Sequence, residues 1–395
     1  MPTQTLKNIS LRISSGGTPS RRRSEYFSIE SGHLWVKSKE LLDSGINNTE
    51  EKITDEALKN SSAKYFPEHS VLIAMYGANV GQLGWLKNPA TVNQAVCGLV
   101  IDPEKADWRY VFYALLQNRK NLTVQARGAA QQNLNQDLIK DFEIPFLPLE
   151  NQHLVVGILS VYDDLIENNT RRIQILEQMA QAIYTEQFDS ASQKKEKKVP
   201  LGEIIKIHRG KSYSSDELSE NEGIPFVNLK CLVRDGGFRK SGLKWFIGKY
   251  KNTQKVVAGD IVMAVTDMTQ DRRIVARAAR VPTLEGGFGV ISMDLVKIEP
   301  KDGNDKDYIY SLLRWSGFSD EVKNHANGAN VLHLIPDRIT DYKTYVAPTD
   351  QQKEFGEKVR PLLNLIDKLE LQDESLRKTR DLLLPKLVTG EIAVK

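Results

Sequence analysis

The chain has 395 residues, of which 40% are hydrophobic and 27% charged, and its formal net charge is +3. This length predicts two or three domains, and the ordinary composition excludes a fibrous protein and wholesale disorder. No apolar run approaches the roughly 18 residues that a membrane span needs, and the N-terminus lacks the apolar core of a secretory signal, so we expect a cytoplasmic protein. Cys97 and Cys231 stand far apart in sequence, which argues against a disulfide framework or a zinc site.

Residues 1–148 are expected to form a β-rich domain. Short runs such as "VLIAMYG" (71–77) and "CGLVI" (97–101) combine β-branched and other apolar residues and are bounded by Gly, Pro, Asn and Asp. Runs of this kind predict strands joined by tight turns.

One long helix is predicted over residues 149–188. Pro148 stands just ahead of Glu150, which indicates a helix start with an acidic first turn. Apolar residues recur along the helix close to an a/d heptad pattern. We expect this seam to contain Leu154, Ile158, Val161 and Leu165. A linker over 189–199 follows, and it includes the basic run 194–198.

Residues 200–347 are expected to form a second β-rich domain, with strands such as "IVMAV" (261–265). A second long helix is predicted over 348–386, with a C-terminal tail over 387–395. Pro385 should end this helix, because proline cannot continue the hydrogen-bond ladder. The expected seam of the second helix contains Phe355, Val359, Leu362, Ile366 and Leu369.

The two halves of the chain are similar in sequence. "RGAAQQNLNQDLIKDF" (127–142) matches "NGANVLHLIPDRITDY" (327–342), and "HSVLIAM" (69–75) matches "GDIVMAV" (259–265) at a slightly different shift. Unequal shifts are typical of a duplication with loop insertions. We therefore predict an α+β fold with two α/β domains, each followed by a long helix, related by an internal pseudo-twofold axis.

The predicted helices are long enough to act as a spacer. At 1.5 Å per residue they span roughly 50 to 57 Å, which is more than a small domain needs. Two matching apolar seams predict that the helices pair as an antiparallel coiled coil between the two domains. In the alternative interpretation each helix packs only on its own domain, which explains the repeat but not the helix length.

No motif for catalysis or cofactor binding is present. The chain lacks a GxxxxGK[ST] phosphate loop, a GxGxxG fingerprint, an HExxH pair and a GxSxG elbow. We therefore expect no metal site and no catalytic residues. An enzyme whose active site is assembled from distant segments is the alternative.

Several phrases resemble the specificity subunit of type I restriction-modification enzymes. They are "SSGGTPS" (14–20), "AMYGANVGQLG" (74–84), "TVNQAV" (91–96), "PLGEIIKIHRGKSY" (200–213) and the helix end "LRKTRDLLLPKLVTGEI" (376–392). The resemblance extends over essentially the full chain. Its helix signatures are fairly specific, whereas the phrases in the two β-rich domains are looser.

The resemblance implies a DNA-binding subunit without catalysis, in which each target-recognition domain reads one half of an asymmetric, gapped target. The paired helices would set the gap and dock two methyltransferase subunits, and restriction subunits would join that core. S-adenosylmethionine and ATP with Mg²⁺ are then expected in the partner subunits, and no cofactor in this chain. Two readers on one side of a duplex should stand about 34 Å apart or slightly more.

Candidate DNA contacts follow from residue type and from position in expected loops. Arg and Lys reach phosphates and guanine, whereas Asn and Gln read adenine. The predicted contacts are Arg21, Arg22, Arg23, Lys37, Ser38, Lys39, Tyr76, Gly77, Asn79, Lys211, Asn228, Lys230, Thr269, Gln270, Arg272 and Arg273. The loops 76–79 and 267–273 are the main candidates for base readout, because they differ sharply between otherwise similar halves. The alternative interpretation needs no DNA. The basic runs would then be solvated surface residues, and the loops would differ because loops without a function diverge freely.

Two further groups of residues keep two interpretations each. Gly128 and Gly328 should mark tight turns in the repeated stretch, which either contacts DNA or only returns the chain to the next helix. Some apolar helix residues off the expected seams either meet a methyltransferase subunit or pack on the recognition domains. These residues are Val155, Leu159, Ile166, Leu363 and Leu365. A coiled-coil scaffold without DNA contact and a disguised DNA-modifying enzyme are the competing functions.

Overall fold

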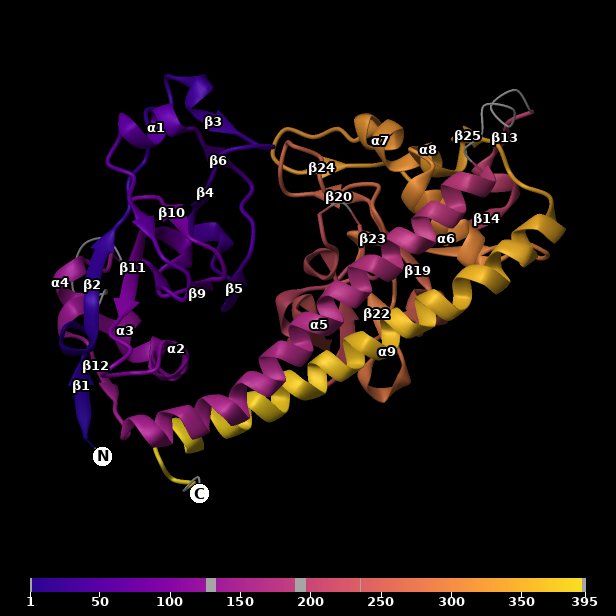
Figure 1. Ribbon diagram of the computed structural model, residues 1–395. Coiled ribbons are helices and arrows are strands. Elements are labelled where there is room, and N and C mark those ends of the chain that lie inside the picture. Colours follow the sequence, from indigo (N-terminus) through magenta and orange to yellow (C-terminus); the bar gives the residue numbers. More distant parts are fainter. Residues whose placement is uncertain (1, 126–132, 189–196, 235, 393–395) are drawn as a thin grey trace. The chain divides into compact units, whose positions relative to one another are not determined.

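The computed structural model describes residues 2–125, 133–188, 197–234 and 236–392 (Figure 1). The chain divides into two compact units, unit 1 with residues 1–167 and 373–395 and unit 2 with residues 168–372. Two 40-residue helices, α5 (Leu149–Phe188) and α9 (Thr349–Val388), contribute residues to both units. Most of the predicted linker, 189–196, lies outside the described residues.

The described residues of unit 1 form two five-stranded sheets and one two-stranded sheet. The first sheet has the order β2 (Ser10–Ser15), β11 (Val96–Ile101), β8 (Val71–Ala74), β9 (Leu83–Leu86) and β5 (Ser44–Ile46). The second has the order β3 (Phe27–Ser28), β6 (Lys52–Ile53), β4 (His33–Val36), β10 (Ala90–Val92) and β7 (Tyr65–Phe66). The short sheet pairs β1 (Thr3–Thr5) with β12 (Glu143–Pro145). The shorter helices are α1 (Asp55–Lys59), α2 (Trp108–Gln117), α3 (Arg119–Gln125) and α4 (Gln136–Asp141).

Unit 2 repeats this strand order among its described residues, except that its first sheet has four strands and no counterpart of β5. Its first sheet has the order β14 (Ile205–Arg209), β23 (Leu295–Pro300), β19 (Ile261–Ala264) and β21 (Ala278–Arg280). Its second has the order β15 (Leu218–Ser219), β17 (Lys244–Phe246), β16 (Ile224–Val227), β22 (Gly289–Ile291) and β18 (Lys255–Val256). The short pairs are β13 (Val199–Pro200) with β25 (Lys343–Thr344) and β20 (Thr266–Asp267) with β24 (Leu332–His333). The shorter helices are α6 (Lys306–Trp315), α7 (Phe318–Val322) and α8 (Asp337–Thr340).

The parallel strand pair of each second sheet shows the same register. In unit 1, β4 and β10 run parallel, and Val36 lies opposite Val92. In unit 2, β16 and β22 run parallel, and Val227 lies opposite Ile291. These buried β-branched residues fit a strand that is covered on both faces, so the parallel pair anchors the loops that follow it.

A buried glutamine attaches the start of each long helix to its own unit. The Gln152 side chain accepts from Asp107 N–H at 2.9 Å and donates to the Leu147 carbonyl at 2.8 Å. In unit 2 Gln352 accepts from Asp305 N–H at 3.0 Å and likewise donates to a carbonyl just ahead of its helix. Both aspartates are the N-caps of the helices that follow, α2 and α6. The same polar attachment therefore orients each long helix.

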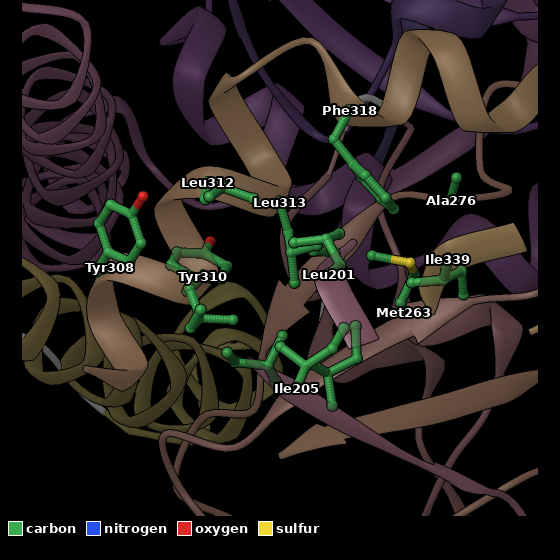
Figure 2. Packing of buried hydrophobic residues seen from close by; sticks show 14 of the residues in the cluster. Leu201, Ile205, Met263, Ala276, Tyr308, Tyr310, Leu312, Leu313, Phe318 and Ile339 are labelled. Atoms are coloured by element: carbon green, nitrogen blue, oxygen red, sulfur yellow. The ribbon is translucent and has the colours of Figure 1, made fainter. Parts of the chain in front are cut away.

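The core of unit 2 gathers side chains from the sheet, the short helices and the two long helices. Figure 2 shows Met263, Phe318 and Ile339 converging with Leu201 at its centre. The long helices contribute Leu176, Ala180, Tyr184 and Phe188 from α5, and Phe355, Val359, Leu363, Ile366 and Leu369 from α9. Burial of this apolar surface, rather than helix propensity, holds this part of α5 and α9 in place.

Within each unit α5 and α9 contact each other in antiparallel order. In unit 1, Arg380 Nη1 lies 2.7 Å from Asp163 Oδ1, and Val155 and Leu159 share a core with Leu384. In unit 2, the buried residues of α5 from Leu176 to Phe188 share a core with those of α9 from Phe355 to Leu369. Figure 1 shows the two helices side by side in each unit.

The buried face of α5 differs from the predicted seam by one residue. Leu154, Val161 and Leu165 are 41%, 54% and 42% exposed, whereas Val155 and Leu159 are fully buried. The prediction was wrong because two neighbouring columns of α5 are both apolar, and heptad spacing alone does not select between them. Ile158 is half-buried, and Ile166 is buried, in the same column as Val155 and Leu159.

The predicted seam of α9 lies on the buried face. Phe355, Val359, Ile366 and Leu369 are buried, and Leu362 is half-buried. Of the two interpretations of Val155, Leu159, Ile166 and Leu363, packing within the chain holds, because all four side chains are buried. Leu365 is half-buried against the core of unit 2.

Pro385 does not end α9, contrary to the prediction. The helix continues to Val388, and Thr389 N–H still donates to the Pro385 carbonyl at 3.1 Å. A proline this close to a helix end removes only one backbone donor, so the last turn tolerates it. In the part of the chain that the structure describes, no helix is long and apolar enough to cross a membrane.

Candidate functional site

The best-defined loop cluster of unit 1 surrounds the turn Asn93–Val96. Val96 N–H donates to Asn93 O at 3.1 Å and closes the turn. Asn93 N–H donates to Val36 O at the end of β4 (2.9 Å), and Ala95 O accepts from Met75 N–H after β8 (2.8 Å). We call these residues the turn frame of unit 1. The frame ties together loops that are far apart in sequence.

Unit 2 contains the same turn frame around Ser292–Leu295. Leu295 N–H donates to Ser292 O at 2.9 Å, and Ser292 N–H donates to Val227 O at the end of β16 (2.8 Å). Asp294 O accepts from Val265 N–H, directly after β19, at 2.9 Å. Each hydrogen bond thus has its counterpart in unit 1.

A glycine packs directly under each turn. A Cβ atom on Gly16 would lie 1.8 Å from Val92 O, and a Cβ atom on Gly210 would lie 1.9 Å from Ser292 O. Only glycine permits this close backbone approach. The N–H groups of both glycines donate to the last carbonyl of the turn at 3.2 Å, so the first strand of each unit also joins its frame.

The repeated stretch of sequence joins the frames as well. Leu134 N–H donates to Met75 O at 2.9 Å, and Leu334 N–H donates to Val265 O at 2.8 Å. Gly328 lies in a tight turn, as predicted, with φ at +154° and its Cβ position 1.9 Å from a carbonyl oxygen. Gly128 lies outside the described residues.

Two predicted DNA contacts share one carboxylate. Arg21 donates to both oxygens of Glu51 at 2.9 and 2.8 Å, and Lys37 donates to the same carboxylate at 2.7 Å. The hydrogen bond from Arg21, followed by that from Lys37, lowers the pKa of Glu51 to about 2. The positive charge of Arg21 and Lys37 is therefore partly neutralised inside the chain.

The neighbouring cations differ in their pairing. Arg23 donates to the Tyr26 hydroxyl at 2.7 Å, and Lys39 pairs with Glu50. Arg22 is exposed and has no side-chain partner among the described residues. Ser38, which begins a short 3₁₀ turn, is half-buried. Arg22 is thus the most available cation of this group.

The loop that follows β8 is exposed. Tyr76 is 39% exposed, and Gly77 begins a short 3₁₀ turn with φ at +74°, a conformation that favours glycine. Asn79 is half-buried and ends this turn. These residues adjoin Met75 of the turn frame, so the frame positions their backbone.

In unit 2 the corresponding loop is organised by Asp267, which is fully buried. Its carboxylate accepts from the N–H groups of Ile274 (2.8 Å), Val275 (3.2 Å) and Thr269 (2.9 Å). Burial alone would raise the pKa of Asp267, but these backbone hydrogen bonds hold it below its usual value. The loop is therefore preorganised.

The predicted contacts in this loop are partly engaged within the chain. Thr269 Oγ1 donates to Asp267 at 2.8 Å, and Gln270 Nε2 donates to the Ala329 carbonyl of the repeated stretch at 3.1 Å. Arg272 is half-buried with φ at +53°, and Arg273 is exposed. The loop 268–273 and the repeated stretch thus form one surface of unit 2.

Asn228 is a structural residue, and its prediction as a DNA contact is corrected. It is 5% exposed, and its amide nitrogen donates to Gly242 O (2.8 Å) while its oxygen accepts from Lys230 N–H (2.9 Å). The prediction was wrong because residue type and position in a loop do not show whether an Asn side chain is buried. This side chain caps a short helical turn and does not face solvent. Lys230 is exposed. Lys211 Nζ lies 3.2 Å from Glu217 Oε1 and forms an ion pair with it.

Sequence reasoning missed the exposed residues at the two turn tips. Gln94 and Met293 are the second residues of the two turns, and Met293 is 54% exposed. Thr18 Oγ1 donates to Gln94 Oε1. The signal was present in "TVNQAV" and "VISMDL", but only the folded frame shows that these stretches correspond.

Among residues 2–125, 133–188, 197–234 and 236–392, no group of three or more His, Cys, Asp or Glu residues is placed to hold a metal ion. Burial raises the pKa of the Cys97 thiol to about 12 and that of Cys231 to about 11, so neither is a thiolate at neutral pH.

Comparison with known proteins assigns the class. The model of the type I restriction modification DNA specificity domain matches residues 25–178 and 193–375. The two ranges cover most of the sequence, and the chain therefore belongs to this family.

Particular relatives match over nearly the full length. The chain is 27% identical over 413 residues to the type I restriction enzyme MjaIX specificity subunit of Methanocaldococcus jannaschii, across 97% of this chain and 91% of that one. It is 24% identical over 394 residues to the MjaVIII specificity subunit of the same organism, across 92% and 87%. The crystal structure of a type I restriction-modification S subunit from M. genitalium shares the fold, with a TM-score of 0.58 at 18% identity over 98% of this chain and 95% of that one.

Proposed function

We propose that this chain reads a two-part DNA target and brings methyltransferase and restriction subunits to it, without catalysing a reaction itself. The observation that carries the proposal is the turn frame, which occurs in both units with the same backbone hydrogen bonds and with different exposed side chains. A repeated frame with unlike tips suits two readers of unlike half-sites. Membership of the DNA specificity family supplies the class of target.

Affinity for DNA would come from exposed cations in the loops of the two units. Arg22 lies in the loop between β2 and β3, Lys230 lies three residues after β16, and both side chains are exposed. Contacts from such residues to phosphates position a protein on the duplex, while residues at the loop tips read bases. The remaining predicted contacts on exposed loops, Tyr76, Gly77 and Arg273 among them, belong to the same proposed surface.

The long helices would hold the two readers apart. Their antiparallel contacts within each unit support a coiled-coil spacer that relates the duplicated halves by a pseudo-twofold axis. A spacer of this kind fixes the gap between the half-sites. The target should be asymmetric because the two loop sets differ.

An exposed apolar stripe on α5 is the proposed docking place for a methyltransferase subunit. In unit 1 it consists of Leu154, Val161 and Leu165, which lie on the outer face of the helix. Clustered apolar side chains in water are typical of a protein interface. S-adenosylmethionine and ATP with Mg²⁺ would belong to the partner subunits.

Salt dependence of DNA binding tests the first part of the proposal. Fluorescence anisotropy of the purified chain with duplex DNA should show affinity that falls steeply with salt, because bound phosphates release counterions. The double variant R22A/K230A should bind more weakly. The slope of log affinity against log salt concentration should fall in magnitude by about two. R171A/K378A removes two exposed cations of the long helices and is the matched control.

Two results would favour the competing functions. Absence of salt-sensitive DNA binding would favour a coiled-coil scaffold. Methylation or cleavage of DNA by the isolated chain, after addition of S-adenosylmethionine or Mg²⁺ with ATP, would show a disguised enzyme.

Co-purification tests the docking proposal. The variant L154S/V161S/L165S should remain folded and lose its methyltransferase subunit, because the three side chains contribute little to the core. The control R171S/Q174S/Q178S changes three exposed polar positions of the same helix. Retention of the methyltransferase by the first variant would exclude this stripe as the interface.

A further inference from the structure

The tips of the two turn frames carry side chains of different chemistry at one structural position. Resting on the DNA-reading function proposed above, we propose that Gln94 specifies an adenine in one half-site and that Met293 specifies a thymine in the other. Each residue would then determine the specificity of its unit.

The frames fix the backbone on both sides of each tip. In unit 1, Asn93 is tied to β4 and Ala95 to the segment after β8, at 2.9 and 2.8 Å. In unit 2, Ser292 and Asp294 make the same two attachments at 2.8 and 2.9 Å. The tip residue between them is exposed, so its side chain projects from a rigid backbone. A reading side chain needs this combination of a fixed Cα atom and a side chain that a ligand can reach.

The rest of each turn serves the fold in both units. Val96 and Leu295 are buried in the two cores, and Asn93 Oδ1 supports its own turn by accepting from Ala95 N–H at 3.1 Å. A purely structural turn has no need for glutamine in one copy and methionine in the other. The difference lies at the position that a ligand would meet.

The Gln94 side chain has the donor and acceptor that adenine requires. The Thr18 hydroxyl donates to Gln94 Oε1 and so orients the amide. Oε1 retains a second lone pair for the adenine amino group, and Nε2 retains its hydrogens for adenine N7. This bidentate pairing distinguishes adenine from the other bases in the major groove.

Met293 has a flexible apolar side chain that is 54% exposed. The thymine methyl group is the distinctive apolar feature of the major groove, and contact with it replaces water on both surfaces. An unbranched thioether adapts readily to such a contact.

Gln270, a reader predicted from the sequence, is less suited to this task. Its Nε2 group donates to the carbonyl oxygens of Gly328 and Ala329 at 3.4 and 3.1 Å. An amide whose donors are engaged within the chain is not free to pair with a base edge.

Long-read sequencing of N6-methyladenine tests the inference in a host that carries the cognate methyltransferase but lacks the native gene. The host is complemented with the wild-type chain, Gln94→Ala or Met293→Ala. With Gln94→Ala, discrimination against other base pairs at one A·T position of one half-site should fall by about tenfold or more. The other half-site and the gap should stay unchanged. Met293→Ala should relax one A·T position in the other half-site. Gln178→Ala and Met179→Ala, at neighbouring exposed positions of α5, are matched controls that should leave the motif unchanged.

The outcomes separate this inference from the proposed function. If the wild-type chain directs no split motif, the proposed function itself fails. If the wild-type chain directs a split motif and both tip variants methylate the same motif with the same base preference at every position, the inference fails. Relaxation at a G·C pair, or of both variants in the same half-site, also overturns it. For a variant without methylation in the host, binding of the purified chain to targets substituted at each base pair gives the same readout.

Discussion

At the scale of single residues, the charge of unit 1 depends on Glu51. This carboxylate binds Arg21 and Lys37, and its low pKa keeps it ionised at every pH at which the protein would bind DNA. A DNA phosphate would have to compete with Glu51 for both cations. Glu51 therefore reduces the attraction that the basic run "SRRRSEY" suggests in the sequence.

Glu51→Gln should strengthen binding to duplex DNA. The substitution preserves the shape of the side chain and removes its negative charge, so Arg21 and Lys37 become available and the salt dependence becomes steeper. Anisotropy titrations at several salt concentrations measure both effects. Asp55→Asn, which removes an exposed acid that pairs with His33 at 2.6 Å, is the control. Weaker binding by Glu51→Gln would show instead that Glu51 positions the two cations for DNA.

Glu370 makes the stability of unit 2 depend on pH. Burial, followed by the nearby charge of Asp367, raises the pKa of Glu370 to about 7 from an ordinary value of 4.5. Between these two values the unfolded chain has released this proton and the folded chain still holds it. Stability from this group is therefore highest below pH 4.5 and falls as the pH rises to about 7.

Glu370→Gln should raise the free energy of unfolding at pH 8 by about 1 to 3 kcal/mol, because the uncharged amide avoids the cost of the buried charge. Urea unfolding at pH 8 and at lower pH measures the gap in the free energy of unfolding between variant and wild type. The gap should narrow as the pH approaches 4.5. Glu357→Gln, at an exposed position of the same helix, is the control. A gap independent of pH would contradict the proposed ionisation.

At the scale of elements, the sequence was sufficient for the long helices and insufficient for their orientation. Pro148 and Pro348 precede long runs with 3.6-residue periodicity, so the existence and type of both helices were predictable. The buried column of α5 was not, because Leu154 and Val155 are equally apolar. Only the positions of α9 and of the sheet domain make Val155 the buried member.

Leu159→Ala should cost about 2 to 5 kcal/mol of stability, because it removes methyl groups from a fully buried position. Leu154→Ala, on the same helix and with the same change in volume, should cost less than about 1 kcal/mol because that side chain is 41% exposed. Urea unfolding of the two variants makes the comparison. Equal losses would contradict the assignment of the buried face.

The contact between Asp163 and Arg380 distinguishes the helix pair of unit 1 from that of unit 2. Both side chains are largely buried, and Asp163 also accepts from the Tyr113 hydroxyl at 2.5 Å. A shift of 200 aligns the ends of α5 and α9 and places Leu363 and Ala180 at the corresponding positions of unit 2. Those two residues are buried and apolar.

Arg380→Ala should destabilise unit 1 by about 3 to 5 kcal/mol, because it leaves Asp163 buried without its cation. The double variant D163L/R380A installs the residues of unit 2 and should recover most of this loss, apart from the hydroxyl of Tyr113. Adding Tyr113→Phe should recover that part as well. Denaturant unfolding of the series tests the prediction, and a double variant less stable than Arg380→Ala would refute it.

The candidate site was less predictable than the elements. Residue type alone selected exposed cations such as Arg22, but it also selected Asn228, whose amide is used inside the fold. Gln94 and Met293 escaped prediction because their turns are defined by hydrogen bonds to strands tens of residues away. Long-range contacts of this kind leave no periodic pattern in a single sequence.

At the scale of the whole molecule, a duplication would explain how one chain could read two different sequences. The strand order, the glutamine attachment and the turn frame recur in both units, while the exposed tips differ. In the proposed function the shared parts would hold both readers in place, and the divergent parts would allow the two half-sites to change independently. Replacement of one set of tips should therefore alter one half-site and leave the other intact.

The most direct measurement is a methylome comparison by long-read sequencing. Two hosts carry the cognate methyltransferase, and only one of them expresses this chain. We predict that a split, asymmetric N6-methyladenine motif is present with the chain and absent without it. An unchanged methylation pattern, with an active methyltransferase and confirmed expression of the chain, would contradict the proposal that this protein selects the DNA target.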